Sequence, residues 1–242
     1  MISRRRADLL LVERGLFESR AKAQAAIAAG RVTADDKPVR KASEEIPVGA
    51  ALHAEAAHPW VSRGGVKLAA ALDHVGFDPA GHICLDVGAS TGGFTHVLLA
   101  RDARRVYAVD VGREQLHPSL RNESRVTLFE ETDIRALDPS RLPEPPDFLT
   151  IDVSFISLKL VLPAAVALLR APARMIALIK PQFEAGRRVK KGIVRDPQVH
   201  AAVYEDIAGF VATLGWTVAG VIPSPIAGGD GNREFLLGAA RD

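Results

Sequence analysis

Glycines and small polar side chains follow an apolar run near residue 85, a combination typical of a loop that holds a ligand. Residues 83–85 predict a buried strand, which leads into Asp86-Val87-Gly88-Ala89-Ser90-Thr91-Gly92-Gly93-Phe94. The glycines let a ligand approach the backbone with no Cβ in the way. The apolar spacing after Phe94 predicts a helix whose N-terminus offers unpaired N–H groups to an anionic or polar ligand. Asp86 can accept hydrogen bonds from a cationic or hydroxyl-bearing group.

A second acid follows at the end of the next apolar run. The sequence Tyr107-Ala108-Val109-Asp110 predicts a strand, and a carboxylate at its end typically binds the hydroxyls of a ribose. The dinucleotide fingerprint G-x-G-x-x-G is absent because Ala89 and Ser90 follow Gly88. This spacing disfavours a nicotinamide-dependent oxidoreductase.

Charged residues also stand at the ends of later predicted strands. Asp152 ends the run 149–151, Lys180 ends the run 175–179, and Glu234 begins the last strand. In an open α/β sheet the carboxyl ends of parallel strands meet at the ligand crevice. We expect the last strand to be antiparallel, the hairpin partner of residues 216–222, which brings Glu234 to the same rim. Lys67 lies near the start of a helix predicted from residue 62 to about 75.

These motifs resemble those of known methyltransferases. The pattern D-x-G-x-x-x-G-G from Asp86 resembles motif I of the class I S-adenosylmethionine methyltransferases. The order Lys67, Asp152, Lys180, Glu234 is similar to the catalytic tetrad of 2′-O-ribose methyltransferases of the FtsJ type. The resemblance implies a Rossmann-like α/β domain with a seven-stranded sheet and an antiparallel last strand. It implies S-adenosylmethionine as cofactor, with these contacts: Asp86, Gly88, Ala89, Ser90, Thr91, Gly92, Gly93 and Phe94 from the loop, Asp110 and Val111, Asp133 and Ile134.

The first 41 residues have a different character. They hold ten Lys and Arg against five acids, an excess of +5. The apolar spacing predicts two short helices, with Gly15 ending the first and Ser19 capping the second. The pattern from Asp8 to Val32 resembles an S4 domain, a small RNA-binding α+β fold, with Asp36-Lys37 in place of the usual Asn-Gly turn.

Basic side chains on such a module neutralise RNA phosphates without reading sequence. We therefore predict RNA contacts at Arg4, Arg5, Arg6, Arg20, Lys22, Arg31 and Lys41, with Arg63 beside the predicted active site. Residues 183–196 carry five basic groups against two acids. This segment predicts a second RNA-backbone contact, at Arg187, Arg188, Lys190 and Lys191.

The whole chain, from about residue 7 to 238, resembles the TlyA family, which joins an S4 domain to an FtsJ-like domain. The resemblance implies methylation of cytidine 2′-hydroxyls in ribosomal RNA of the small or large subunit, with Lys67, Asp152, Lys180 and Glu234 as catalytic residues. Lys180 would orient or deprotonate the hydroxyl. A lysine acts as a base only when neutral; Lys67 and partial burial favour that form, whereas Asp152 and Glu234 oppose it.

The sequence around Pro59 indicates a boundary between two domains. Pro59 biases the preceding residue away from helix, so we expect an S4-like domain at 1–57, a linker at 58–61 and the methyltransferase domain at 62–242. A hydrophobic content of 48% excludes a disordered chain, and one cysteine fits a reducing, cytoplasmic compartment. We expect no metal site, no membrane span and no obligate protein partner. Two other functions remain open: a non-enzymatic RNA- or ribosome-binding protein, and a membrane-active haemolysin, a label that this family has carried.

Overall fold

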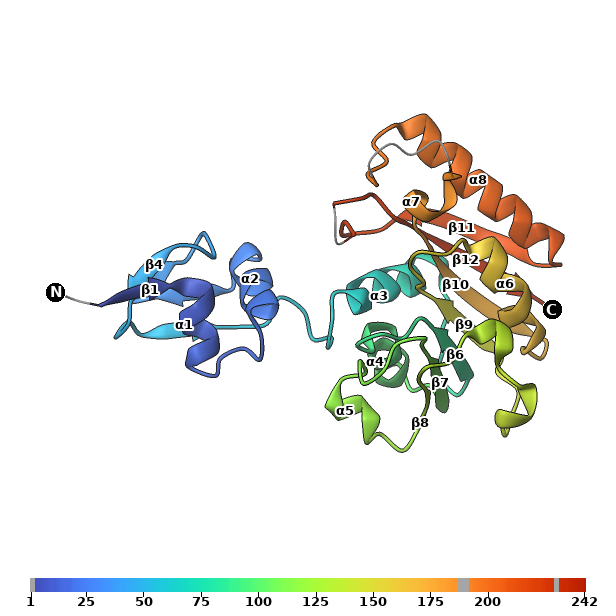
Figure 1. Ribbon diagram of the computed structural model, residues 1–242, viewed down its shortest axis with the longest axis horizontal. Coiled ribbons are helices and arrows are strands. Elements are labelled where there is room, and N and C mark those ends of the chain that lie inside the picture. The colour runs from blue at the N-terminus through green and yellow to red at the C-terminus, as the bar shows by residue number, and fades with distance from the viewer. Residues whose placement is uncertain (1–2, 187–191, 229–230) are drawn as a thin grey trace. The chain divides into compact units, whose positions relative to one another are not determined.

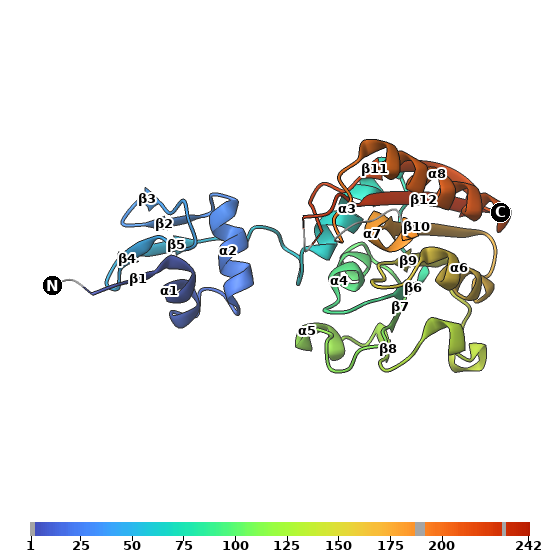
Figure 2. The same ribbon diagram turned by 45° about the horizontal axis from the view of Figure 1, so that its top comes forward.

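The computed structural model describes residues 3–186, 192–228 and 231–242, and it divides into two compact units, Met1–Pro59 and Trp60–Asp242. Each unit has its own buried core. Figures 1 and 2 show the elements of both. No helix among the described residues is long and apolar enough to cross a membrane.

The N-terminal unit packs two short helices on short strands. In chain order its elements are β1 (Arg4–Arg6), α1 (Ala7–Glu13), α2 (Arg20–Ala28), β2 (Val32–Ala34), β3 (Lys37–Pro38), β4 (Glu45–Pro47) and β5 (Leu52–Ala54). β1 pairs with β4, and β2 lies between β3 and β5. The predicted cap is present, because the Ser19 hydroxyl accepts from the N–H of Lys22 at 3.3 Å.

The hairpin between β2 and β3 turns one residue earlier than Asp36-Lys37, where the resemblance to an S4 domain placed the turn. Ala34 pairs with Lys37, so Asp35 and Asp36 form the two-residue turn. Their φ values are +48° and +60°. Aspartate is among the residues that tolerate this left-handed region, and two such residues give the twist that a tight hairpin needs.

The C-terminal unit is built on a seven-stranded sheet. Its elements are α3 (Gly64–Val75), β6 (Ile83–Val87), α4 (Gly93–Ala100), β7 (Arg105–Val109), α5 (Pro118–Arg121), β8 (Val126–Phe129), η1 (Ile134–Ala136), η2 (Pro139–Arg141), β9 (Phe148–Ile151), α6 (Leu158–Ala167), β10 (Ala173–Ile179), α7 (Pro181–Glu184), α8 (Pro197–Thr213), β11 (Thr217–Pro223) and β12 (Phe235–Arg241). The strand order is β11-β12-β10-β9-β6-β7-β8. β12 is antiparallel to both its neighbours, with Ile222 opposite Leu236. The predicted fold class and final hairpin are therefore confirmed.

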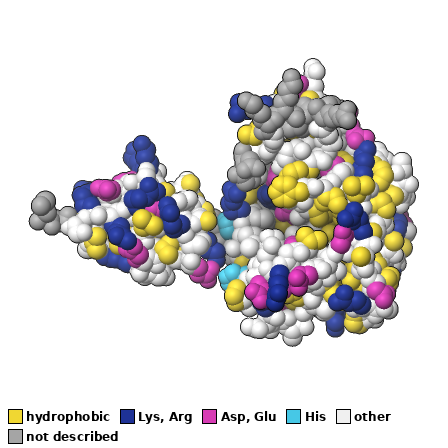
Figure 3. All heavy atoms as spheres, in the orientation of Figure 1, with side chains coloured by type: hydrophobic (Ala, Val, Ile, Leu, Met, Phe, Trp, Pro, Cys, Tyr) yellow, Lys and Arg dark blue, Asp and Glu magenta, His cyan; other side chains and the backbone are white. Residues whose placement is uncertain are grey.

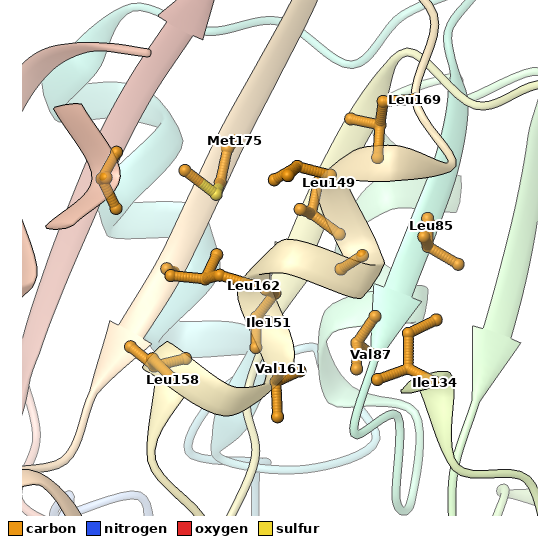
Figure 4. Close-up of a cluster of buried hydrophobic side chains, with 14 of the residues drawn as sticks. Leu85, Val87, Ile134, Leu149, Ile151, Leu158, Val161, Leu162, Leu169 and Met175 are labelled. Carbon is orange, nitrogen blue, oxygen red and sulfur yellow. The ribbon is translucent and has the colours of Figure 1, made fainter. Parts of the chain in front are cut away.

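Side chains that alternate along the strands fill two cores, one on each face of the sheet. On one face, Leu85 and Val87 of β6 and Ile151 of β9 pack beneath α6, as Figure 4 shows with Leu158, Val161 and Leu162. On the other face, Cys84 packs with residues of α3 and α4. Cys84 is fully buried, and burial raises the pKa of its thiol. The helices thus leave the carboxyl ends of β6, β7, β9 and β10 as the rim where loops gather.

Candidate active site

Two adjoining cavities lie at this rim of the sheet. The larger, about 490 Å³, is lined by the loops after β6, β7, β8 and β9. The smaller, about 280 Å³, lies between the start of α3, the loop after β6, and the residues that end β9 and β10. Gly88, Ser90, Asp152 and Ser154 line both cavities. A ligand that fills the larger cavity would therefore reach the smaller one across these four residues.

The loop after β6 can pass between the cavities only because it contains glycine. Gly88 has a φ of +82°, and a Cβ there would lie 2.3 Å from the backbone oxygen of Asp152. A Cβ on Gly93 would lie 2.3 Å from Ser62 Oγ. Gly92 instead faces α5, where a Cβ would meet Leu120 Cδ1 at 2.3 Å. Gly88 and Gly93 thus let the loop lie directly against the segment after β9 and the start of α3 at the edge of the cavities, and the residue types present fit S-adenosylmethionine.

Asp110 joins the ends of β6 and β7 in the larger cavity. One carboxylate oxygen accepts from the N–H of Ser90 and the other from the N–H of Gly112, both at 2.7 Å. A carboxylate oxygen has a second lone pair, so Asp110 can still accept from the hydroxyls of a ribose. Val111, beside it, is 73% exposed at the edge of the cavity.

Asp86 lies behind the loop instead of in either cavity lining. Its side chain is fully buried, and its two oxygens accept from the hydroxyls of Thr95 at 2.7 Å and Thr150 at 2.8 Å. Thr150 is its direct cross-strand partner on β9. Burial raises the pKa of Asp86 to about 6, although both hydroxyls oppose the shift. Asp86 therefore holds the end of β6 against α4 and β9, and neither cavity lining includes it.

Asp133 and Ile134 lie at the far wall of the larger cavity. Asp133 accepts from the N–H and the guanidinium of Arg135, and this hydrogen bonding lowers the pKa of Asp133. Ile134 is buried and contributes an apolar surface. Of the twelve predicted cofactor contacts, only Asp86 and Gly92 are absent from the two cavity linings.

The four predicted catalytic residues meet as two ion pairs. Lys67 Nζ lies 2.5 Å from Glu234 Oε2, and Lys180 Nζ lies 2.5 Å from Asp152 Oδ1. Lys67, Lys180 and Glu234 are buried. Lys67, Lys180 and Asp152 line the smaller cavity, with Arg63 at its edge. The arrangement places two amines and a carboxylate around a space that can admit a polar acceptor group.

Several residues that hold this site were not predicted as site residues, although they lie close to Asp152 and Lys180 in the sequence. Ser154 Oγ accepts a hydrogen bond from Lys180 Nζ at 2.8 Å. Glu184 accepts from the Ser157 hydroxyl at 2.5 Å and from the N–H of Leu158 at 2.7 Å, which caps α6. These contacts join the segment after β9 to the segment after β10.

A second set of contacts supports the residue at the start of β12. Asn232 is 1% exposed; its amide accepts from the N–H of Val194 and donates to the carbonyl of Gly192, both at 2.9 Å. His200, also buried, contacts the carbonyl of Val194 at 3.0 Å. A structural amide, Asn232, thus lies two residues before the charged Glu234.

Most basic side chains predicted to contact RNA already have partners within the N-terminal unit. The fully buried carboxylate of Asp8 accepts from Arg6 at 3.0 Å and from Arg20 at 2.9 Å, and this hydrogen bonding lowers the pKa of Asp8. Other contacts join Arg4 to the carbonyl of Glu45, Arg5 to Glu13, Lys22 to Glu18 and Arg31 to Glu55. Figure 3 shows Lys and Arg gathered on the visible face of this unit, interspersed with acids. Lys41 is exposed and makes no ion pair among the described residues.

The second predicted RNA contact and the predicted lack of a metal site concern different parts of the chain. Arg187, Arg188, Lys190 and Lys191 lie outside the described residues. Across the part of the chain that the structure describes, no group of three or more His, Cys, Asp or Glu side chains is arranged to hold a metal ion.

The fold and the paired charges define a Rossmann-like methyltransferase domain preceded by a small basic α+β unit. Residues 60–241 match the family model of the FtsJ-like methyltransferases, and residues 5–52 match that of the S4 domain. The chain belongs to the TlyA family of FtsJ-like methyltransferases with an N-terminal S4 domain.

Three relatives illustrate this membership. The chain is 44% identical to the 16S/23S rRNA (cytidine-2′-O)-methyltransferase TlyA of Mycobacterium tuberculosis, over 98% of this chain and 90% of that protein. It is 48% identical to YqxC of Bacillus subtilis, a provisionally named rRNA methyltransferase, over 96% and 84%. A solved structure of a provisionally named hemolysin from Streptococcus thermophilus matches with a TM-score of 0.77 and 41% identity, covering 100% of this chain and 90% of that one.

Proposed function

We propose that this protein transfers a methyl group from S-adenosylmethionine to the 2′-hydroxyl of cytidine in ribosomal RNA. The observation that carries the proposal is the meeting of Lys67, Asp152, Lys180 and Glu234 beside the cavity that the loop after β6 bounds. The relatives named as rRNA (cytidine-2′-O)-methyltransferases support the choice of acceptor. A ribosomal RNA substrate corresponds to a cytoplasmic location.

The larger cavity would hold the nucleoside part of the cofactor. Asp110 would accept from the ribose hydroxyls, and Asp133 would accept from the adenine amino group against the apolar surface of Ile134. The backbone between Gly88 and Gly93 would take the methionine end. When bound, S-adenosylmethionine supplies a methyl group that is already electrophilic.

The protein's remaining tasks are to hold the acceptor and to manage one proton. The 2′-oxygen gains a methyl group and loses its proton, so a group must receive or steer that proton. Lys180 lines the smaller cavity and is the group best placed to do so, as a base when neutral or as a hydrogen-bond donor when charged. Asp152 holds the Lys180 amine, and Glu234 holds the Lys67 amine. Orientation of well-placed reactants supplies about 7–11 kcal/mol in favourable systems.

Mapping of 2′-O-methyl groups tests the proposal directly. Ribosomal RNA from cells that lack this protein is incubated with S-adenosylmethionine and either wild-type protein or Lys180→Ala. We expect new cytidine 2′-O-methyl groups with the wild type only. We expect Lys180→Ala to bind cofactor and RNA within a few-fold of wild type, because an interaction made mainly in the transition state contributes little to ground-state affinity.

The same experiment separates the other two functions. Wild-type protein that binds ribosomal RNA but adds no methyl group, and does not bind S-adenosylmethionine in a calorimetric titration, would be a non-enzymatic RNA-binding protein. Preference for a nicotinamide dinucleotide in that titration would also contradict the proposal. Release of haemoglobin from erythrocytes by purified protein would instead support the haemolysin function.

A further inference from the structure

The Lys180 side chain makes two polar contacts of different kinds. Its contact with Asp152 Oδ1, at 2.5 Å, is an ion pair between opposite charges. Its contact with Ser154 Oγ, at 2.8 Å, is a hydrogen bond. Coulomb attraction depends on distance, whereas a hydrogen bond also depends on the angle at the donor. Ser154 therefore adds a constraint on direction that Asp152 alone does not provide.

The Ser154 hydroxyl is itself held in a fixed place. Two residues before it, the backbone oxygen of Asp152 rests against Gly88, where there is no room for a Cβ. Three residues after it, Ser157 is bonded to Glu184, which also accepts from the N–H of Leu158. Glu184 lies in α7, the short helix that Lys180 precedes. The segment that carries Ser154 is thus held on one side by the loop after β6 and on the other by α7, which directly follows Lys180.

Ser154 also faces the space where the reaction would occur. It lines both cavities, and its residue is exposed. Within the described residues its hydroxyl accepts from Lys180 and donates to no protein group. This leaves the hydroxyl proton available to a ligand without disturbing the contact with Lys180.

We propose that Ser154 is a positioning residue that acts through Lys180, by accepting the hydrogen bond that directs Nζ toward the acceptor in the smaller cavity. The role rests on the proposed function, since it concerns the group that meets the 2′-hydroxyl. Ser154 holds no proton of the reaction and forms no bond with the methyl group. Its removal leaves Asp152 as the partner of Lys180 and takes away the directional constraint on the Lys180 amine.

Single-turnover methylation measures the effect on the reaction. A displacement of about 1 Å near reacting groups can lower a rate by about 100-fold, so we expect Ser154→Ala to lose about 10- to 100-fold. Affinities for S-adenosylmethionine and RNA should stay within a few-fold. Ser154→Thr keeps the hydroxyl and should recover most of the rate. Ser140→Ala, at an exposed serine of η2, is the matched control and should react as the wild type does.

A second readout does not depend on activity. In protein labelled with ¹⁵N-lysine, the Lys180 Nζ signal is identified by its loss in Lys180→Arg. We expect a sharp signal in the wild type and in Ser154→Thr. In Ser154→Ala we expect a broader signal, because the amine protons exchange faster with water. Lys67, held by Glu234, is an internal reference whose signal should not change.

The two readouts keep the possible failures distinct. If the wild type does not methylate ribosomal RNA, the proposed function is wrong, and the Lys180 signal still decides whether Ser154 orients the amine. If the wild type is active and Ser154→Ala reacts as fast, or if the Lys180 signal is the same in both proteins, the positioning role is overturned. Loss of rate together with an equal loss at Ser140→Ala would also contradict it.

Discussion

Lys67 and Glu234 are 167 residues apart in the chain, yet Nζ and Oε2 lie 2.5 Å from each other in the interior of the domain. Their side chains are 10% and 3% exposed. Lys67 comes from the first half of α3, and Glu234 directly precedes β12. Gly228 makes room for the pair, since a Cβ there would lie 2.4 Å from Glu234 Oε1. This contact joins the beginning and the end of the methyltransferase domain at its reactive rim.

We predict that replacing either Lys67 or Glu234 alone lowers the free energy of unfolding more than replacing both. Removal of one partner from a buried ion pair leaves an uncompensated charge and lowers the free energy of unfolding by about 3–5 kcal/mol, whereas an apolar pair of similar volume is often neutral. Lys67→Met and Glu234→Leu should each destabilise the protein, and the double variant should recover most of the loss. Urea unfolding of the four proteins measures this. A double variant as unstable as the sum of the singles would contradict it.

Methylation by the same proteins separates stability from chemistry. If Lys67 and Glu234 belong to the reactive site, the refolded double variant should remain inactive even though it is stable. A stable double variant with wild-type activity would show that the pair is structural only.

The loop after β6 gives a prediction with a matched control. Gly88 and Gly81 have similar φ values, +82° and +73°, but a Cβ on Gly81 has nothing within 4 Å. Gly81→Ala should therefore lose only the strain of a left-handed residue, about 1–2 kcal/mol. Gly88→Ala must also displace the backbone of Asp152, so it should lose more stability and weaken S-adenosylmethionine binding. Calorimetric titration and urea unfolding of both variants test this; equal losses would indicate that the contact with Asp152 is not limiting.

The strand ends could be predicted from the sequence because the period of apolar residues changes there. An acid or a lysine that directly follows a buried run, as at Asp110, Asp152 and Lys180, must lie at the carboxyl end of its strand. The parallel order of an α/β sheet then brings these ends together. Glu234 was predictable only through the antiparallel hairpin that places the start of β12 at the same rim.

Contacts between side chains could not be predicted in the same way. Asp86 also lies near the end of a strand, but its orientation depends on Thr95 and Thr150, which come from a helix and a neighbouring strand. Asp8 was one acid among several, and its burial between Arg6 and Arg20 depends on how α1 packs on α2. Such partners are set by tertiary packing, for which local sequence carries no periodic signal.

The buried carboxyl of Asp86 predicts a specific dependence of stability on pH. Burial raises its pKa from 3.8 to about 6. Between these values the unfolded chain releases the Asp86 proton while the folded protein keeps it, so this group makes the free energy of unfolding fall as pH rises. The shift corresponds to about 3 kcal/mol. Asp86→Asn does not titrate, so wild-type stability relative to this variant should fall by about 3 kcal/mol between about pH 3 and pH 7. Urea unfolding across that range measures the difference, and parallel curves would contradict the assignment.

The N-terminal unit offers two basic residues that differ in one respect. Lys41 is exposed and makes no ion pair within the described residues, whereas Arg20 is half-exposed and bonded to the buried carboxylate of Asp8. If both contact RNA phosphates, Lys41→Ala and Arg20→Ala should each weaken RNA binding and reduce the slope of log affinity against log salt concentration by about 1. Affinity for S-adenosylmethionine should not change. Only Arg20→Ala should lower the stability of the N-terminal unit, by about 1–2 kcal/mol, because a hydrogen bond to a buried charge is lost.

Filter binding over a salt series, with thermal unfolding of each variant, distinguishes the two effects. An unchanged slope for Lys41→Ala would assign that charge to solvent, and an unchanged slope for Arg20→Ala with lowered stability would assign Arg20 to the structure of the unit alone.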